Sequence, residues 1–188
     1  MQARGRARPL RGILRKATLL LVLLAAPAAA AALEGRVIHI ADGDTLTVLD
    51  ARQQSHKVRL AGIDAPERGQ PFGRRSAEAL GRLTANRTVT VDGGKTDRYQ
   101  RRVGIVRVAP ADCTACAPSV DVGLALIGAG LAWHYRAYER EQSATDRAQY
   151  QAAEAGARDR QDGLWADRAP TAPWDWRRAR RDGSAARH

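Results

Sequence analysis

The stretch Gly35-Arg-Val-Ile-His-Ile-Ala-Asp-Gly-Asp-Thr-Leu-Thr-Val-Leu-Asp50 contains two β-branched, apolar runs joined by an Asp-Gly pair. This pattern is typical of a β-hairpin, and we expect Gly43 to take a positive φ in its turn. The turn does not account for Asp44, because the start of a strand has no need of a carboxylate. We therefore predict that Asp42 braces the turn and that Asp44 has a chemical role.

The hairpin begins a region rich in Val, Ile, Leu and Thr. Residues 35–41, 44–50 and 55–62 predict three consecutive antiparallel strands, and residues 88–91 and 103–108 predict two more. Between the third and fourth strands, residues 71–86 have apolar side chains at helical spacing.

Two further helices are expected towards the end of the chain. One is capped by Asp121 and ends near Gly130, and the other covers about 139–158. The Leu and Trp of Gly163-Leu-Trp-Ala166 are expected to pack back on the domain.

This order of elements predicts an α+β chain that is mainly β. Five short strands with a helix after the third indicate a five-stranded Greek-key barrel of the oligonucleotide/oligosaccharide-binding type, the OB-fold, with about three flanking helices. An open α+β sandwich is the alternative that the pattern leaves open.

The first 32 residues read as a signal peptide. Residues 1–16 carry six basic side chains and no acid, residues 17–33 are almost wholly apolar, and cleavage is expected after Ala32. An uncleaved membrane anchor is the alternative, although the apolar run is shorter than the roughly 20 residues of a spanning helix. The folded domain is expected at 33–168, followed by a basic, disordered tail at 169–188.

The charge of the mature domain is mildly basic. The whole chain has 31 basic and 20 acidic residues and a formal charge of +11; without the leader the charge falls to about +5. Such an excess is compatible with a nucleic acid partner and equally with an ordinary solvated surface.

Cys113 and Cys116 are the two cysteines of the chain, and prolines stand on both sides of them. In an exported protein this spacing favours a small disulfide in a loop. A zinc site lacks further ligands nearby, and a thioredoxin-like redox motif lacks its helix start.

Charged side chains recur at strand ends and in loops. Arg59 stands between apolar residues of a strand, so it requires an anionic partner. Asp44 and Asp64 offer the hard oxygen ligands that Ca²⁺ or Mg²⁺ prefers. Glu67 follows Pro66 and is placed to accept a proton from water, while Arg59 and Arg101 are suited to bind phosphoryl oxygens. Together they form a sufficient set for phosphodiester hydrolysis.

At this point the chain resembles the staphylococcal-type thermonuclease family over about 35–166. The matching segments, in the family's order, are Asp42-Gly-Asp-Thr45, Val58-Arg-Leu-Ala-Gly-Ile-Asp-Ala-Pro-Glu67, Thr96-Asp-Arg-Tyr-Gln-Arg101 and Gly130-Leu-Ala-Trp133. The resemblance implies a five-stranded barrel and a Ca²⁺-dependent nuclease that cleaves DNA and RNA at the 5′-oxygen side and leaves 3′-phosphates.

The resemblance also implies roles for single residues. Asp44 and Asp64 are similar to the family's metal carboxylates, and Ala65 to the residue that gives a carbonyl ligand. Arg59 and Arg101 resemble the phosphate-binding arginines, and Glu67 the catalytic carboxylate. The expected substrate-binding residues are Tyr99, Tyr135 and Tyr138.

The chain departs from the family pattern at three places. The prototype has a glycine where this chain has Gln100, and its later tyrosine pair stands two residues apart whereas Tyr135 and Tyr138 stand three apart. The loop around Cys113 is an extension relative to the prototype's hairpin.

The leading hypothesis is therefore a periplasmic or secreted, monomeric nuclease with DNA and RNA as substrates and no stable membrane association after cleavage. A non-catalytic nucleic-acid-binding barrel is the alternative. A redox or metal-storage protein built on Cys113 and Cys116 has only that pair in its favour.

Overall fold

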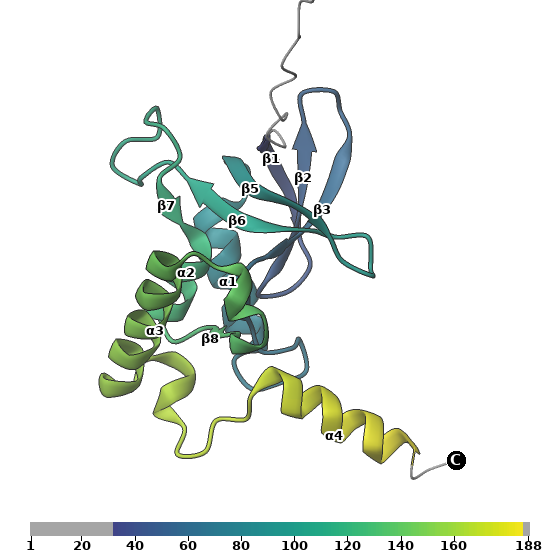
Figure 1. Cartoon of the computed structure of the whole chain (residues 1–188), viewed down its shortest axis with the longest axis vertical. Helices are drawn as coiled ribbons and strands as arrows, with labels where there is room; N and C mark the ends of the chain where they lie inside the picture. Colours follow the sequence, from purple (N-terminus) through teal and green to yellow (C-terminus); the bar gives the residue numbers. More distant parts are fainter. Residues whose placement is uncertain (1–31, 186–188) are drawn as a thin grey trace, which may run out of the picture.

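The computed structural model describes residues 32–185 and contains a closed β-barrel with helices packed on one side (Figure 1). The strands β1 (Leu33–Ile40), β2 (Thr45–Asp50) and β3 (Ser55–Leu60) pair antiparallel in succession. This confirms the three consecutive strands predicted from the sequence.

Two later strands close the barrel. β5 (Thr88–Thr96) pairs antiparallel with β1 and with β6 (Arg102–Val108), and β6 pairs in parallel with β3. The strand order β3-β2-β1-β5-β6 returns to β3, which is the OB-fold. The predicted fold class is confirmed, and the open sandwich alternative is wrong.

Alternating apolar residues of these strands fill the barrel. Since successive side chains of a strand point to opposite faces, every second residue faces inward. The buried set, each at most 1% exposed, is Val37, Leu46, Val48, Val58, Leu60, Val89, Val91, Val106 and Val108. Burying each such side chain contributes about 1.5–3 kcal/mol.

Three helices cover one side of the barrel, as predicted. α1 (Gly73–Thr84) buries Leu80, and α2 (Val122–Gly128) is capped by Asp121, whose side chain accepts a hydrogen bond from the Leu124 amide at 3.0 Å. α3 (Ala144–Asp159) starts later than the predicted 139, because Ser143 caps it and a 3₁₀ helix η1 (Arg136–Glu141) precedes it.

The remaining short elements hold the helical side together. β4 (Ile63–Asp64) pairs antiparallel with β8 (Trp133–His134), and β7 (Val120–Asp121) pairs antiparallel with β6. The 3₁₀ helix η2 (Gly163–Ala166) buries Leu164 and Trp165, as the sequence predicts.

The end of the chain differs from the prediction. Instead of a disordered tail over 169–188, Pro173–Ala185 forms the helix α4 at the far end of the molecule from the barrel strands (Figure 1). Proline at the first helical position is favourable because its missing N–H has no partner to lose there. Trp174 then packs on the domain, with its ring 5.5 Å from that of Trp133. The prediction of disorder is wrong for these residues.

Gly43 also differs from the prediction, because it does not have a positive φ. Glycine is required there by space instead. A Cβ at this position would lie 2.6 Å from the Cβ of Ser76 and 2.7 Å from that of Ala65. The turn therefore packs directly on α1 and on the segment after β4.

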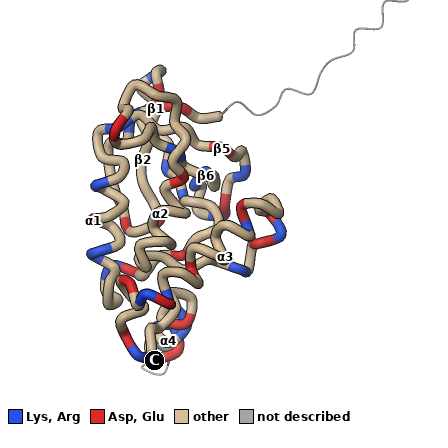
Figure 2. The backbone as a smooth tube through the Cα atoms, turned by 90° about the vertical axis from the view of Figure 1, so that its left-hand side faces the viewer, with Lys and Arg blue, Asp and Glu red and all other residues tan. Residues whose placement is uncertain are grey.

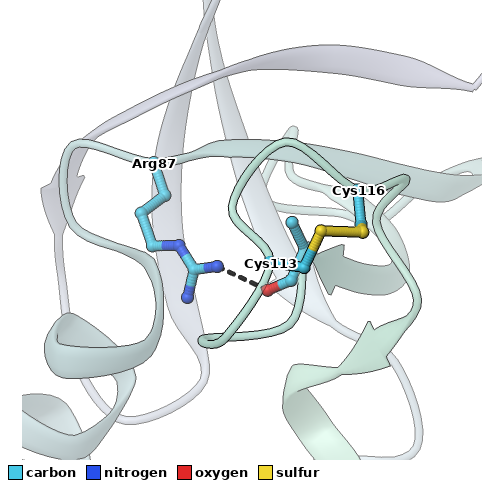
Figure 3. The surroundings of a disulfide bond; sticks show 4 residues. Arg87, Cys113 and Cys116 are labelled. Atoms are coloured by element: carbon cyan, nitrogen blue, oxygen red, sulfur yellow. Dashed lines mark hydrogen bonds between the residues drawn. A yellow bond between two sulfur atoms is a disulfide. The ribbon is translucent and has the colours of Figure 1, made fainter.

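Figure 3 shows the disulfide between Cys113 and Cys116 in the loop that joins β6 to β7. Beside it, Arg87 donates a hydrogen bond to the carbonyl of Ala109, which ties the start of β5 to this loop. The predicted pairing of the cysteines is present.

Within residues 32–185 no helix has the length and apolar character needed to cross a membrane. The predicted signal peptide lies outside the described residues. Along the described chain, basic and acidic residues are interspersed (Figure 2).

Candidate active site

Asp44 lies at the mouth of the barrel, where the turn enters β2. The Asp42 side chain accepts a hydrogen bond from the Asp44 amide at 3.0 Å, so Asp42 braces the turn. Asp44 is only 5% exposed. Its carboxylate accepts hydrogen bonds from the Thr45 hydroxyl (2.9 Å) and from the Ala65 amide (3.2 Å), which fix its direction.

Asp64 comes to the same place from β4. This two-residue strand is held by its pairing with β8, in which Asp64 lies opposite Trp133. The Asp64 side chain is fully buried. A buried carboxylate is stable only with cationic or hydrogen-bonding partners, so the contacts of Asp64 decide its function.

Arg59 joins the two aspartates. Its Nη1 donates to Asp44 Oδ2 at 2.6 Å, and its Nη2 donates to Asp64 Oδ1 and to the Ile63 carbonyl, both at 3.2 Å. Arg59 is therefore the anion-paired strand arginine that the sequence predicted. Its side chain is 17% exposed.

Glu67 reaches the cluster through a residue that the sequence did not single out. Arg177 of α4 donates from Nη1 to Glu67 Oε1 at 2.7 Å and from Nη2 to Asp64 Oδ2 at 2.7 Å. A third contact joins Arg177 Nη1 to Asp64 Oδ1 at 3.2 Å. The guanidinium thus bridges the buried aspartate and the partly buried glutamate.

Arg101 approaches from the β5–β6 hairpin. Its Nη1 donates to the Thr45 hydroxyl at 3.3 Å, and Thr45 in turn donates to Asp44, so Arg101 lies one side chain away from the aspartates. Asp97 holds it there, accepting from Arg101 Nε at 2.8 Å. The five polar residues predicted from the sequence therefore converge on one mouth of the barrel.

The electrostatics of the cluster combine crowded carboxylates with two guanidinium groups. Burial raises the pKa of Asp64 above its ordinary value, and the neighbouring charge of Asp44 raises it further, although Arg177 and Arg59 act in the opposite direction. Burial, followed by the charge of Asp44, also raises the pKa of Asp42 to about 6. Negative charge is thus concentrated where little water reaches it.

The donor atoms fit a hard divalent cation that keeps several waters. Asp44 and Asp64 supply carboxylate oxygens. The guanidinium of Arg177 already donates hydrogen bonds to the oxygens of Asp64. Across residues 32–185, no three His, Cys, Asp or Glu side chains gather into a metal-binding group, so backbone oxygens and water must complete such a site. Ala65 lies in the cluster through its amide, which contacts Asp44.

The three tyrosines predicted to bind substrate differ in their surroundings. Tyr99 is 60% exposed at the hairpin tip, and the guanidinium of Arg101 lies 5.2 Å from its ring centre. Tyr135 and Tyr138 contact each other edge to face with ring centres 5.5 Å apart, and the Tyr135 ring also lies 5.6 Å from that of Trp174. The tyrosine pair therefore lies beside α4.

A cavity of about 390 Å³ adjoins the cluster on the α4 side. It is lined by aromatic and charged residues of β8, α3 and α4: Trp133, His134, Tyr135, Arg136, Ala137, Glu154, Arg158, Trp174 and Arg178. The start of α4 thus contributes both to this cavity and to the contacts of the carboxylates.

The comparisons with known proteins agree with this geometry. A family model described as staphylococcal nuclease homologue matches residues 57–167. Protein ParB of Escherichia coli is 41% identical over 166 residues, which cover 88% of this chain and 91% of that protein. Micrococcal nuclease of Shigella flexneri is 37% identical over 171 residues, covering 91% and 95% of the two chains. A protein named as an uncharacterized endonuclease of Escherichia coli O157:H7 is 36% identical over 159 residues, covering 85% and 94%.

Proposed function

This chain belongs to the staphylococcal nuclease family, whose members are metal-dependent nucleases, and we propose that it is an exported, Ca²⁺-dependent enzyme that hydrolyses DNA and RNA. The proposal includes cleavage at the 5′-oxygen to leave 3′-phosphates. The observation that carries it is the convergence of Asp44, Asp64, Arg59 and Glu67 within hydrogen-bonded reach of one another, with Arg101 beside them.

The residues divide the reaction between them. Glu67 accepts a proton from water as the water oxygen bonds to phosphorus, and the 5′-oxygen leaves with the electrons of its bond and takes a proton from solvent. Arg59 and Arg101 bind the phosphoryl oxygens and stabilise the negative charge that grows on them. Both arginines are held in place by aspartates, which reduces the reorganisation needed when substrate binds.

The cation site is assigned to Asp44, Asp64 and the carbonyl of Ala65. A bound Ca²⁺ supplies positive charge next to the phosphoryl group. The oxygen-only donor set supports Ca²⁺ or Mg²⁺ over softer metals. The exposed rings of Tyr99 and Tyr138 are suited to stack on bases of a single strand.

Export is supported by the sequence of residues 1–32 and by the disulfide between Cys113 and Cys116. A disulfide persists in oxidising compartments such as the periplasm or the extracellular medium. A periplasmic or secreted location, and a monomeric state, are therefore part of the proposal. Detection of the protein in the periplasmic or culture fraction, with an N-terminus at residue 33, would test it.

The catalytic roles are tested by hydrolysis of single-stranded DNA with Ca²⁺ and with a chelator. We expect Glu67→Gln and Arg59→Ala each to lower kcat on the order of 10²-fold or more. Glu78→Gln is the matched control, because Glu78 is exposed on α1 and pairs with Arg74 at 3.4 Å. Equal rates in Glu67→Gln and the control would refute the role of Glu67.

The ends of the products test the regiochemistry separately. Fragments labelled at the 5′ end and analysed by mass spectrometry should carry 3′-phosphates, and 5′-phosphates would contradict cleavage at the 5′-oxygen. Salt-sensitive binding without cleavage at any Ca²⁺ concentration would instead support the non-catalytic binding protein.

A further inference from the structure

The helix α4 lies outside the segment that the family model matches, yet it enters the centre of the site. The match ends at residue 167, and α4 begins at Pro173. Arg177 lies one turn into this helix and contacts both Asp64 and Glu67. A segment beyond the part that the family model matches thus contacts two of the residues assigned to metal binding and proton transfer.

The start of α4 is anchored to the domain by contacts of several kinds. Ala172 and Pro173 are buried, and the Gln70 side chain donates a hydrogen bond to the Thr171 carbonyl at 2.6 Å. The ring of Trp174 packs on Trp133 and Tyr135. These contacts place Arg177 in front of the carboxylates in a defined orientation.

The second half of α4 has a different character. Arg178, Arg180 and Arg181 are all exposed, and the side chain of Arg177 itself keeps 36% of its surface exposed. The helix is therefore attached to the domain at its beginning, and its cationic contact with the site is open to solvent on one side. Such a contact is accessible to a competing cation.

Arg177 uses the same oxygens that a metal ion requires. Its two terminal nitrogens lie 3.2 and 2.7 Å from Asp64 Oδ1 and Oδ2, so both oxygens of that carboxylate have a cation on them. The contact at 2.7 Å with Glu67 Oε1 likewise takes up an oxygen that would accept a proton from water. Asp64 Oδ1 also accepts from Arg59 at 3.2 Å, so a divalent cation at this carboxylate would add to the repulsion between positive groups unless Arg177 left.

We propose that α4 is an autoinhibitory strap whose Arg177 excludes the metal ion from Asp64 and holds Glu67 until the helix moves away. This inference rests on the proposed function, since it concerns the same carboxylates. The closed state is the one described here, and metal and nucleic acid bind an open state in which Arg177 has left Asp64. Their apparent affinity is then reduced by the fraction of molecules that are open.

The first test measures Ca²⁺ binding to the full chain by calorimetry, without substrate. Arg177→Gln is compared with Arg181→Gln, which removes the same charge from an exposed position one turn further along α4. We expect Arg177→Gln to tighten Ca²⁺ binding about 10-fold or more relative to the control. Equal affinities, or weaker binding in Arg177→Gln, would overturn the strap.

The second test follows α4 directly by hydrogen exchange. On addition of Ca²⁺ to the wild-type chain, the amides of 173–185 should exchange faster while those of β1 to β3 do not. Unchanged or slower exchange of α4 on Ca²⁺ binding would contradict displacement. Arg177→Gln should show fast exchange of α4 before Ca²⁺ is added.

The two proposals fail in different ways. If the protein cleaves DNA but Arg177→Gln and Arg181→Gln bind Ca²⁺ equally well, the proposed nuclease is supported and the strap is refuted. If the two variants differ strongly in Ca²⁺ affinity but the protein does not cleave DNA, the strap is supported and the proposed nuclease is refuted. Absence of Ca²⁺ binding in every variant would overturn both the strap and the proposed Ca²⁺ site.

Discussion

At the scale of single residues, close packing around the two aspartates leaves little freedom. The turn before Asp44 lies against α1 and Ala65, and the amide of Ala65 contacts Asp44 itself. The position of the Asp44 carboxylate is therefore linked to the volume of its neighbours. Interiors packed to this density respond to the addition of one methyl group.

Gly43→Ala tests this packing. The added Cβ would lie within 2.7 Å of two other Cβ atoms, so we expect a loss of about 1–3 kcal/mol in the free energy of unfolding, measured with urea. Gly128→Ala is the control, because no atom lies within 4 Å of its added Cβ. A change no larger than that of the control would show that the turn adapts.

Gln100 stands where the family's prototype has a glycine. Its φ is +60°, in the left-handed region that glycine prefers, so the backbone conformation is kept without the residue that favours it. A side chain in this region costs about 1–2 kcal/mol, and the greater freedom of glycine in the unfolded chain offsets part of the difference.

Gln100→Gly should therefore raise the free energy of unfolding by about 0.5 kcal/mol or more. The measurement is a denaturation curve, with Gln54→Gly as the control, since Gln54 does not have a positive φ. We expect the control to lose stability. A loss of stability in Gln100→Gly would mean that the Gln100 side chain has a favourable role that outweighs its strain.

At the scale of elements, the β5–β6 hairpin is the part of the site that depends most on local hydrogen bonds. Its tip, Asp97–Arg101, is organised by one carboxylate. Asp97 accepts from the amides of Tyr99 (2.9 Å) and Arg101 (3.0 Å) as well as from the Arg101 side chain. This single residue fixes the direction in which Arg101 points.

Asp97→Asn is expected to destabilise the protein by about 1 kcal/mol at pH 7. Burial alone would raise the pKa of Asp97, but the hydrogen bonds from the Arg101 amide and guanidinium hold it below its ordinary value of 3.8. Because the folded state binds this proton less readily than the unfolded state, the stabilisation is complete above pH 3.8 and is lost as the pH falls further.

The difference in stability between wild type and Asp97→Asn should therefore shrink below pH 3.8, as measured by thermal unfolding across pH 2–7. Asp112→Asn, in the exposed loop after β6, is the control. A difference that stays constant down to pH 2 would contradict the lowered pKa of Asp97.

The elements also show what the sequence can predict. The barrel strands and α1 were predictable because period-two and helical patterns depend on neighbouring residues. The start of α3 was predicted too early, since Ser143 caps the helix although the Glu-Arg-Glu-Gln run at 139–142 favours one. β5 was predicted to end at residue 91, but pairing with β6 extends it to Thr96.

For the site, the predicted acids and arginines lie together, whereas Arg177 was missed. Its partner Asp64 is 113 residues away, and no periodic pattern marks a contact of that kind. The Arg-rich sequence around Arg177 resembles that of a solvated tail. Pro173 at a helix start and the closely spaced Trp174 and Trp176 were the signals of a packed helix.

At the scale of the whole molecule, the barrel and the helical side meet at the carboxylates. Asp44 comes from the barrel, Asp64 from the short β4–β8 sheet and Arg177 from the C-terminal helix. A cation that binds to Asp44 and Asp64 joins the barrel to the β4–β8 sheet. Its binding free energy therefore adds to the stability of the folded state.

Ca²⁺ should accordingly raise the melting temperature of the full chain, and a chelator should reverse the rise. At a Ca²⁺ concentration 100 times the Kd, the gain is about 2.7 kcal/mol. Differential scanning fluorimetry with NaCl of equal ionic strength as the control measures it. Asp64→Asn should abolish the response to Ca²⁺; a response retained in that variant would place the cation elsewhere.

The short link between η2 and α4 has a consequence for how any soluble ligand competes with Arg177. Because Asp167–Ala172 tether the guanidinium to the domain that carries Asp64, it acts as an intramolecular ligand at an effective concentration on the order of millimolar. Diluting the protein does not weaken this contact. Cutting the chain within this tether would make the contact of Arg177 with Asp64 an ordinary bimolecular one. Dilution would then weaken the contact.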